Sequence, residues 1–302
     1  MRKTRSSKIK RSTGTLIFDW ANTIFMLIIC FLCIYPIWYV VVNSFNDAHD
    51  AMMGGIYWWP RMFSLENYRT VFADNRVLQA FKVTIAKTVI GTSVNVFFTA
   101  MVAYPMSKNY LVGRKFYMAM GTITMFFSGG LIPTFILFKK LNLLNNFMVY
   151  VIPAAFNFFN LLIFINFFNE IPPALEESAR IDGATDWKIF RSIILPLSKP
   201  VLATIALFAG VGQWNDWFGG VMYMTTRMDL EPIQTYLYRM VAQVGSNQVA
   251  GSISAGNISA QSTTSTAIKL ATMVITTLPI CLVYPFLQKY FVKGVMVGAV
   301  KE

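Results

Sequence analysis

Six long apolar stretches constrain the fold of this chain more than any other feature of its sequence. A helix needs about 20 mainly apolar residues to cross a bilayer, because hydrocarbon offers backbone polar groups no partner and a helix satisfies its own. The stretches span approximately residues 21–42, 83–107, 116–138, 149–168, 201–222 and 267–288. The sequence therefore predicts an all-α, polytopic membrane protein with six transmembrane helices.

The composition agrees with a chain that lies mostly in lipid. Of its 302 residues, 55% are hydrophobic and 13% are charged, whereas a soluble domain has roughly 25% charged residues. A soluble protein with a net charge of +12 would be a candidate for nucleic-acid binding. In a membrane protein the placement of the cations matters more than their sum, so we expect the lipid bilayer and no nucleic acid as a partner.

Arg and Lys gather in the segments that the positive-inside rule assigns to the cytoplasm. They are Arg2, Lys3, Arg5, Lys8, Lys10 and Arg11 in the N-terminal tail, Lys108, Arg114 and Lys115 between spans two and three, Arg180, Lys188, Arg191 and Lys199 between spans four and five, and Lys289, Lys293 and Lys301 in the C-terminal tail. The first apolar run is too long for a signal peptide and is predicted to be a retained anchor. Both termini are predicted to be cytoplasmic.

These assignments divide the chain into four predicted parts. They are a basic cytoplasmic tail (1–20), a first span with its outer link (21–82), a core domain of five spans (83–288) and a C-terminal cytoplasmic tail (289–302). The core includes a cytoplasmic loop (171–200) and an outer loop (225–266), whose run 245–265 is uncharged and rich in Gly, Ser, Asn and Gln. Such a run cannot fold alone; it is either a flexible reach into the exterior or slack.

The first outer link carries several aromatic residues, namely Trp58, Trp59, Phe63 and Tyr68. They suit an interfacial helix whose rings lie at the level of the lipid headgroups. They suit a loop folded on the outer face equally well.

The loop 171–200 is predicted to form two short helices with a turn between them. Pro172 and Pro173 favour a helix start, and Glu176 with Arg180 has the spacing of a favourable i,i+4 ion pair. Gly183 can supply the left-handed residue that ends the helix.

The second helix of this loop is predicted from Thr185 onward. Thr185 can cap it, and Trp187, Phe190 and Ile194 recur at helical spacing to give one apolar face. Amphipathicity alone leaves open whether this hairpin projects from the membrane or lies on the bilayer surface.

The same loop resembles the EAA loop of binding-protein-dependent ABC importer permeases. The resemblance rests on Glu177-Ser178-Ala179, Asp182-Gly183-Ala184, Phe190, Ile193, Leu195 and Pro196, with Ser178 where the family usually has Ala. It implies a coupling helix that docks in a groove of a cytoplasmic ATPase subunit. The coupling residues would be Glu176, Glu177, Ala179, Asp182, Gly183, Ala184 and Phe190.

The resemblance also implies the partners of the chain. They would be a second permease subunit in a heterodimer, two cytoplasmic ABC ATPase subunits and an extracytoplasmic solute-binding protein, all at the bacterial cell membrane. The chain has no G-x-x-x-x-G-K-[ST] phosphate loop, so ATP and Mg would be bound by the ATPase partner. No potential metal ligands lie near Cys30, Cys33 or Cys281 in the sequence, so no metal site is predicted. We also expect the chain itself to have no cofactor and no enzyme activity.

Further stretches resemble carbohydrate-uptake permeases related to the maltose importer. They are Leu65-Glu66-Asn67-Tyr68 and the tail segments 288–294 and 298–301, the tail being similar to the second permease of such heterodimers. The run 128–133 is similar to a subgroup associated with complex polysaccharide breakdown. The resemblance thus implies a sugar or oligosaccharide as the substrate.

Span five contains a polar and aromatic cluster, formed by Gln213, Trp214, Asn215, Asp216 and Trp217. An ionisable residue deep in a span, as Asp216 is predicted to be, marks a functional site by default. Rings that stack on sugar faces, with amides and a carboxylate that bond hydroxyls, are what a sugar site needs. The cluster is therefore a candidate substrate path. Alternatively, the two tryptophans belong to the outer aromatic belt and Asp216 caps or pairs locally.

Two other function classes fit the sequence less well. A membrane-embedded enzyme would need a constellation such as paired histidines with carboxylates inside the spans, and His49 lies outside them. An ion-coupled transporter would favour several ionisable groups within the membrane, and only Asp216 qualifies.

Overall fold

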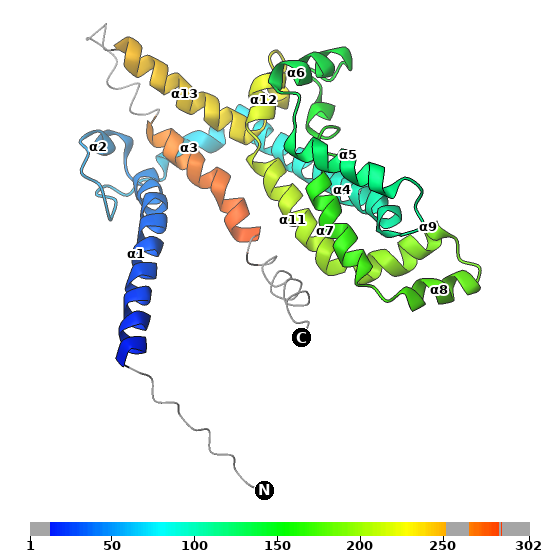
Figure 1. Ribbon diagram of the computed structural model, residues 1–302. Helices are drawn as coiled ribbons and strands as arrows, with labels where there is room; N and C mark the ends of the chain where they lie inside the picture. The colour runs from blue at the N-terminus through cyan, green and yellow to red at the C-terminus, as the bar shows by residue number, and fades with distance from the viewer. Residues whose placement is uncertain (1–12, 252–265, 284, 286–302) are drawn as a thin grey trace. The chain divides into compact units, whose positions relative to one another are not determined.

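The computed structural model describes residues 13–251, 266–283 and 285, and the regular secondary structure within these is helical apart from one antiparallel bridge between Asn46 and Phe63 (Figure 1). Three helices are long and apolar enough to cross a membrane: α1 (Thr13–Ser44), α4 (Asn75–Ser107) and Thr266–Val283. Three bent helix pairs raise this number to six if each pair is one span. The fold is therefore all-helical with three to six candidate spans. Residues 13–20 of the predicted N-terminal tail belong to α1, whereas residues 1–12 and the predicted C-terminal tail (289–302) lie outside the described residues.

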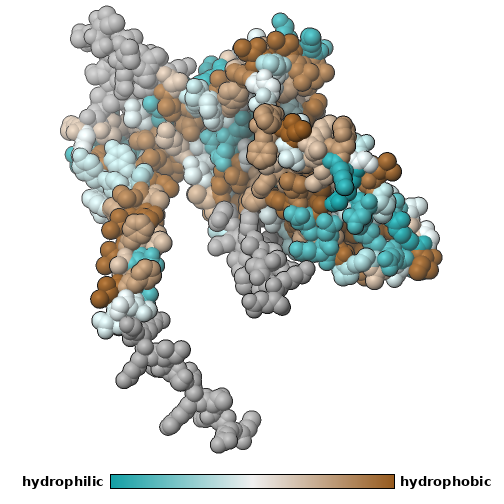
Figure 2. Space-filling view, in the orientation of Figure 1, coloured by the Kyte–Doolittle hydropathy of each residue, from teal (hydrophilic) through white to brown (hydrophobic). Residues whose placement is uncertain are grey.

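The chain divides into two compact units, Met1–Thr70 with Gly256–Val274 and Val71–Ala255 with Ile275–Glu302. In the first unit, none of the most apolar window of α1 is buried. Figure 2 shows hydrophobic residues along most of this helix. Lipid is the solvent that such a surface requires, so the prediction of a first spanning helix over 21–42 is confirmed as a helix of suitable length.

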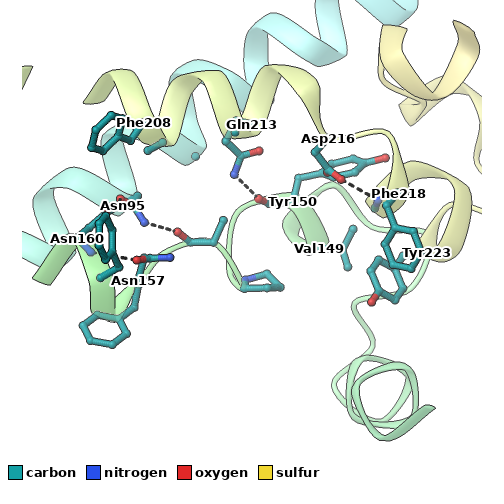
Figure 3. A pocket seen from close by; sticks show the side chains of 18 of the residues that line it. Asn95, Val149, Tyr150, Asn157, Asn160, Phe208, Gln213, Asp216, Phe218 and Tyr223 are labelled. Carbon is teal, nitrogen blue, oxygen red and sulfur yellow. Dashed lines mark hydrogen bonds between the residues drawn. The ribbon is translucent and has the colours of Figure 1, made fainter. Parts of the chain in front are cut away.

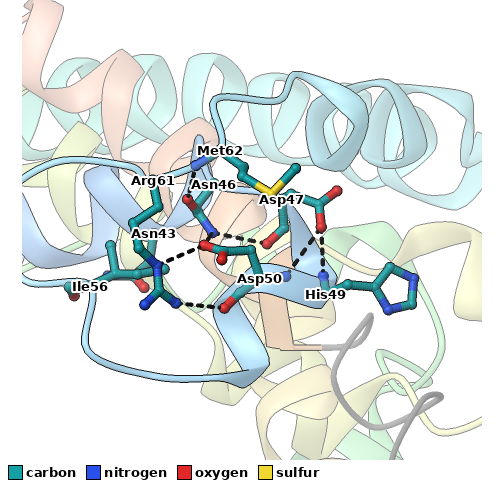
Figure 4. A network of polar contacts seen from close by, with 8 residues as sticks. All are labelled: Asn43, Asn46, Asp47, His49, Asp50, Ile56, Arg61 and Met62. Atoms are coloured by element: carbon teal, nitrogen blue, oxygen red, sulfur yellow. Dashed lines mark hydrogen bonds and ion pairs between the residues drawn. The ribbon is translucent and has the colours of Figure 1, made fainter.

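The link after α1 is a folded loop with a polar centre (Figure 4). Asp47 caps the short helix α2 (Ala48–Met52) by accepting from the backbone N–H groups of its first turn. The Asp50 carboxylate accepts from Asn46 Nδ2 at 2.9 Å and from Arg61 Nε at 3.1 Å. The Asn46 amide, followed by the Arg61 guanidinium, holds the pKa of Asp50 below its ordinary value. Trp58 and Trp59 lie in no helix, whereas Tyr68 lies in α3 (Glu66–Ala73). The two tryptophans therefore belong to a folded loop and not to an interfacial helix, and the placement of this loop on the outer face stays a prediction.

Two residues of the Leu65–Tyr68 motif tie this loop to the end of α1. Asn67 lies in the first turn of α3 (Glu66–Ala73) and donates through Nδ2 to Ser44 O at 3.0 Å and to Asn46 O at 2.9 Å. The Tyr68 hydroxyl lies 2.7 Å from Ser44 Oγ. The motif therefore closes the link through buried hydrogen bonds.

Replacing Asn67 with alanine is expected to destabilise this unit by about 1–3 kcal/mol, because two buried carbonyl groups lose their donor. The thermal midpoint of the purified protein measures the loss. Thr70→Ala is the matched control, since Thr70 is exposed on the same helix and its hydroxyl bonds only the preceding turn. Equal midpoints for the two variants would contradict the role of Asn67.

In the second unit, α4 packs against α7 (Phe158–Asn169) and α11 (Lys199–Asn215). Figure 1 shows the three helices side by side. α5 (Arg114–Phe126) packs on α7 where Gly121 meets Phe158, and a Cβ at Gly121 would lie 1.9 Å from that ring. These contacts place α4 at the centre of the unit.

The predicted span 116–138 is not one straight helix. α5 ends at Phe126 and α6 (Leu131–Lys140) leaves it at 114°. Gly130 caps α6 with φ of 85°, a conformation that glycine adopts at little cost. The Gly-Gly pair in the run 128–133 therefore breaks the helix.

Two further predicted spans are also interrupted. The span 149–168 is a 3₁₀ turn, η1 (Phe147–Tyr150), then an irregular segment, and only then α7, which Asn157 caps. The span 201–222 breaks after α11, and α12 (Phe218–Tyr223) follows the break. Asp216 Oδ1 accepts from Gly219 N, in the first turn of α12, at 2.9 Å. Mean hydropathy does not register such caps, because the residues around them remain apolar.

The region after α12 contains η3 (Met228–Leu230) and α13 (Ile233–Gly251). The run 245–265, which was predicted not to fold alone and to be a flexible reach or slack, begins as a continuation of α13 through Gly251. Extending an existing helix needs no new nucleus. Residues 252–265 lie outside the described residues.

Candidate functional site

A cavity of about 720 Å³ lies among α4, α7, α11 and α12. It is lined by aromatic, amide and small residues and one carboxylate, which are Gly91, Asn95, Phe138, Val149, Tyr150, Pro153, Ala154, Phe156, Asn157, Phe159, Asn160, Phe208, Ala209, Gly212, Gln213, Asp216, Phe218, Gly219 and Tyr223. The irregular segment before α7 supplies several of them. The interruption of that predicted span thus makes room for the cavity.

The polar groups of the cavity are held in place by backbone carbonyls. Figure 3 shows three asparagines toward one end, Gln213 in the middle and Asp216 toward the other end. Asn95 donates to Ala154 O at 2.7 Å, Asn160 donates to Asn95 Oδ1 at 3.2 Å, and Gln213 donates to Tyr150 O at 2.9 Å. Fixed amides of this kind can bond hydroxyl groups of a ligand.

Asp216 forms an ion pair with Lys87 of α4. Lys87 Nζ lies 3.0 Å from Asp216 Oδ2, and the Lys87 side chain is 0% exposed whereas that of Asp216 is 34% exposed. Lys87 Nζ also donates to Asp216 O at 3.1 Å. A charge buried this fully requires a partner, so the pair fixes the break after α11 against α4.

The structure separates the five residues predicted for the substrate path. Gln213 and Asp216 line the cavity, but Trp214 lines a second pocket and donates through Nε1 to Thr276 O at 3.0 Å. Trp217 stacks on Tyr238 with ring centroids 4.3 Å apart. Neither Asn215 nor Trp217 is among the described lining residues of either pocket. Asp216 caps α12 locally through Gly219 N, as the second alternative predicted. It also faces the cavity, and the role of the cavity as a substrate path stays a prediction.

The loop 171–200 folds as the predicted helical hairpin. It contains α8 (Pro173–Ile181), α9 (Asp186–Ile189), a π-helical turn η2 (Phe190–Ile194) and α10 (Leu195–Leu197). Gly183 joins the helices with φ of 78°, and Thr185 caps α9 by accepting from Lys188 N. The predicted turn and cap are confirmed.

The apolar face of the hairpin is buried against the spanning helices. Ile189, Phe190 and Ile194 belong to one core with residues of α4, α7 and α11. Trp187, which was predicted on the same face, is 52% exposed. The hairpin is thus attached to the helix bundle, and Figure 2 shows hydrophilic residues gathered over α8 and α9.

Glu176 is paired differently from the prediction. Lys108 Nζ, at the end of α4, donates to Glu176 Oε1, and the Tyr104 hydroxyl donates to Glu176 Oε2 at 3.3 Å. Arg180 instead donates to Asp186 Oδ1 at 2.6 Å. The predicted i,i+4 pair between Glu176 and Arg180 is therefore wrong, because Glu176 is buried against Tyr104 and Lys108 while Arg180 stays exposed.

The seven residues predicted for coupling fall into three classes. Glu177, Asp182 and Gly183 are exposed, Ala179 and Ala184 are half-buried, and Glu176 and Phe190 are buried. Glu176 and Phe190 are too buried to touch a partner directly, whereas the other five present surface to one. Ile181, which the sequence reasoning passed over, is 87% exposed beside them.

Residues 6–297 match the family described as "Binding-protein-dependent transport system inner membrane component". The chain belongs to this family. It is therefore a multi-pass inner-membrane permease and not an enzyme. Membership implies an extracytoplasmic binding protein and an ATPase as partners of this inner membrane component.

Similar proteins cover nearly the full length of this family member. Protein LplC of Bacillus subtilis (strain 168) is 39% identical over 94% of the chain and 95% of its own length. The polygalacturonan/rhamnogalacturonan transport system permease protein YtcP of the same organism is 39% identical over 94% of the chain and 98% of its own length. A crystal structure of a bacterial ABC transporter involved in the import of the acidic polysaccharide alginate matches with a TM-score of 0.83 at 29% identity, covering 94% of this chain and 99% of that one.

Sequence reasoning missed two lysines of this inner membrane component. Lys87 lies within the predicted second span, where a lone cation in an apolar run is itself the signal of a paired site. Lys108 was counted only as a cytoplasmic charge. The sequence around it carries no signal that predicts its ion pair with Glu176. Among the described residues, no group of His, Cys, Asp or Glu side chains could hold a metal ion.

Proposed function

We propose that this permease forms half of the translocation path of an ATP-driven importer for oligosaccharides. The observation that carries the proposal is the family match over residues 6–297, together with relatives named for carbohydrate transport. The cavity supports it, because it combines aromatic rings with fixed amides and such groups suit sugar faces and hydroxyls.

In this proposal the chain crosses the membrane six times with both termini in the cytoplasm. Four of the spans are α1, α4, α5 with α6, and the helix Thr266–Val283. The other two are the segment 147–169 and α11 with α12, because the hairpin takes α8 and α9, which are bent partners of α7 and α11. The charge distribution supports this orientation. A second permease subunit completes the path, two ATPase subunits bind ATP and Mg, and a binding protein delivers the sugar.

The hairpin is the proposed contact with the ATPase. Its exposed tip offers Glu177, Ile181, Asp182 and Gly183, while its buried face shares a core with the helices that line the cavity. Closure of the ATPases therefore moves the hairpin and the cavity walls as one body. Glu176 and Phe190 act inside that body and not at its surface.

Glu177→Lys and Gly183→Val are each expected to lower ATP-driven uptake at least tenfold while insertion into the membrane stays normal. The first reverses a charge at the docking surface, and the second forces a β-branched residue into a left-handed conformation. Glu66→Lys is the matched control, because it reverses an equally exposed charge in the other unit. Normal uptake by both hairpin variants would remove the coupling role.

The substrate class is tested by uptake into proteoliposomes that contain the two permeases, the ATPase and the binding protein. Uptake of labelled oligosaccharides is expected with ATP and not with a non-hydrolysable analogue. Uptake of peptides or amino acids instead, under the same conditions, would overturn the proposed substrate class.

A further inference from the structure

The charges beside the cavity have a definite polarity. Among the described residues that line it, Asp216 is the one with a charged side chain. Its partner Lys87 is fully buried and does not belong to the lining. The ion pair therefore turns its carboxylate to the cavity and keeps its ammonium behind the wall.

The ammonium of Lys87 is also fully engaged. Its nitrogen bonds both Oδ2 and the backbone oxygen of Asp216, and it lies 4.7 Å from the centroid of the Tyr150 ring. An ammonium group has three donors and no further charge to offer. Among the described lining residues, an anionic ligand in the cavity would thus meet a carboxylate and no cation.

Uncharged polar atoms remain available in the lining of the cavity. Gln213 Oε1, Asn157 Nδ2 and the Tyr223 hydroxyl have no hydrogen-bond partner within the described part of the chain. Such atoms can donate to and accept from hydroxyl groups. They cannot neutralise a carboxylate.

We propose that the cavity binds an uncharged sugar unit and discriminates against a sugar carboxylate. The inference rests on the proposed function and names the charge class of the unit that the cavity accepts. A carboxylate near Asp216 would be repelled and would lose its hydration without gaining a partner. A uronate unit is therefore expected to bind at least tenfold more weakly than its neutral counterpart.

The test measures equilibrium binding of two labelled probes to the assembled importer in lipid nanodiscs, without the binding protein. The probes are trigalacturonate and the neutral trisaccharide made from it by carboxyl reduction, which differ only in carrying –COO⁻ or –CH₂OH groups. The wild-type complex is expected to bind the neutral probe at least tenfold more tightly. Equal or tighter binding of trigalacturonate would overturn the inference and leave oligosaccharide transport intact as a function.

Two variants tie the result to the ion pair. Lys87→Met leaves Asp216 uncompensated, so the preference for the neutral probe is expected to increase. Lys87→Met with Asp216→Asn makes the wall uncharged, so the preference is expected to fall toward parity. An unchanged preference in the double variant, or binding of neither probe to the wild type, would overturn the assignment of selectivity to this cavity. The uptake assay above judges the proposed function independently.

Discussion

Asp216→Asn is expected to cost the protein about 3 kcal/mol of stability, because it leaves the fully buried Lys87 without a counter-charge. This corresponds to more than a hundredfold change in the folding equilibrium, and the yield of assembled complex should fall accordingly. Lys87→Met is expected to cost far less, about 1 kcal/mol. Asp216 is a third exposed and keeps its bond to Gly219 N, so it is not stranded when the lysine is removed.

The double variant Lys87→Met with Asp216→Asn should recover most of the loss, since a buried ion pair can often be replaced by uncharged side chains of similar volume. Thermal midpoints and complex yield measure all three variants. Asp229→Asn is the matched control, because Asp229 is exposed and pairs only with the exposed Arg227. Equal costs for the two single variants would contradict the asymmetry of burial on which the prediction depends.

Glu176→Lys is expected to uncouple ATP hydrolysis from uptake and to destabilise the hairpin by about 3 kcal/mol. It places two cations together at the end of α4 where Lys108 and Glu176 are now paired and largely buried. The exchange of both residues, Glu176→Lys with Lys108→Glu, should restore much of the uptake per ATP hydrolysed. A residue needed only for folding would change the amount of complex but not this ratio.

Arg180→Ala serves as the control for the hairpin, because Arg180 and its partner Asp186 are both exposed. An exposed pair contributes at most about 1 kcal/mol, so the ratio of uptake to hydrolysis should stay close to that of the wild type. If Glu176→Lys leaves that ratio unchanged, or if the exchange rescues nothing, Glu176 does not hold the hairpin to α4.

The hairpin was predictable from the sequence because its signals are local. Gly183 and Thr185 each determine the backbone within one turn, and both lie where their chemistry indicated. The lengths of α1 and α4 were predictable for the same reason, since an uninterrupted apolar run needs no information from elsewhere in the chain.

The interruptions of the other spans were harder to predict. Asp216 ends α11 by bonding Gly219 and Lys87 at once, and the second of these partners is 129 residues away in the sequence. Trp214 and Trp217 were adjacent candidates for one path, but the break between them turns each toward different neighbours. Periodicity cannot describe side chains on either side of a break, because the helical phase is lost there.

The pairing of Lys87 with Asp216 also bears on how the chain is made. Lys87 enters the membrane with α4 while its partner is still 129 residues from synthesis, a delay of about 6 to 26 s at typical rates of translation. During that time an unpaired lysine at mid-span would cost about 2.5–3.5 kcal/mol. α4 has 33 residues, well beyond the roughly 20 that a bilayer requires. The spare length lets the nascent helix slide along its axis and keep the Lys87 ammonium in the headgroup region. Asp216 can then pair with it once α11 has been inserted.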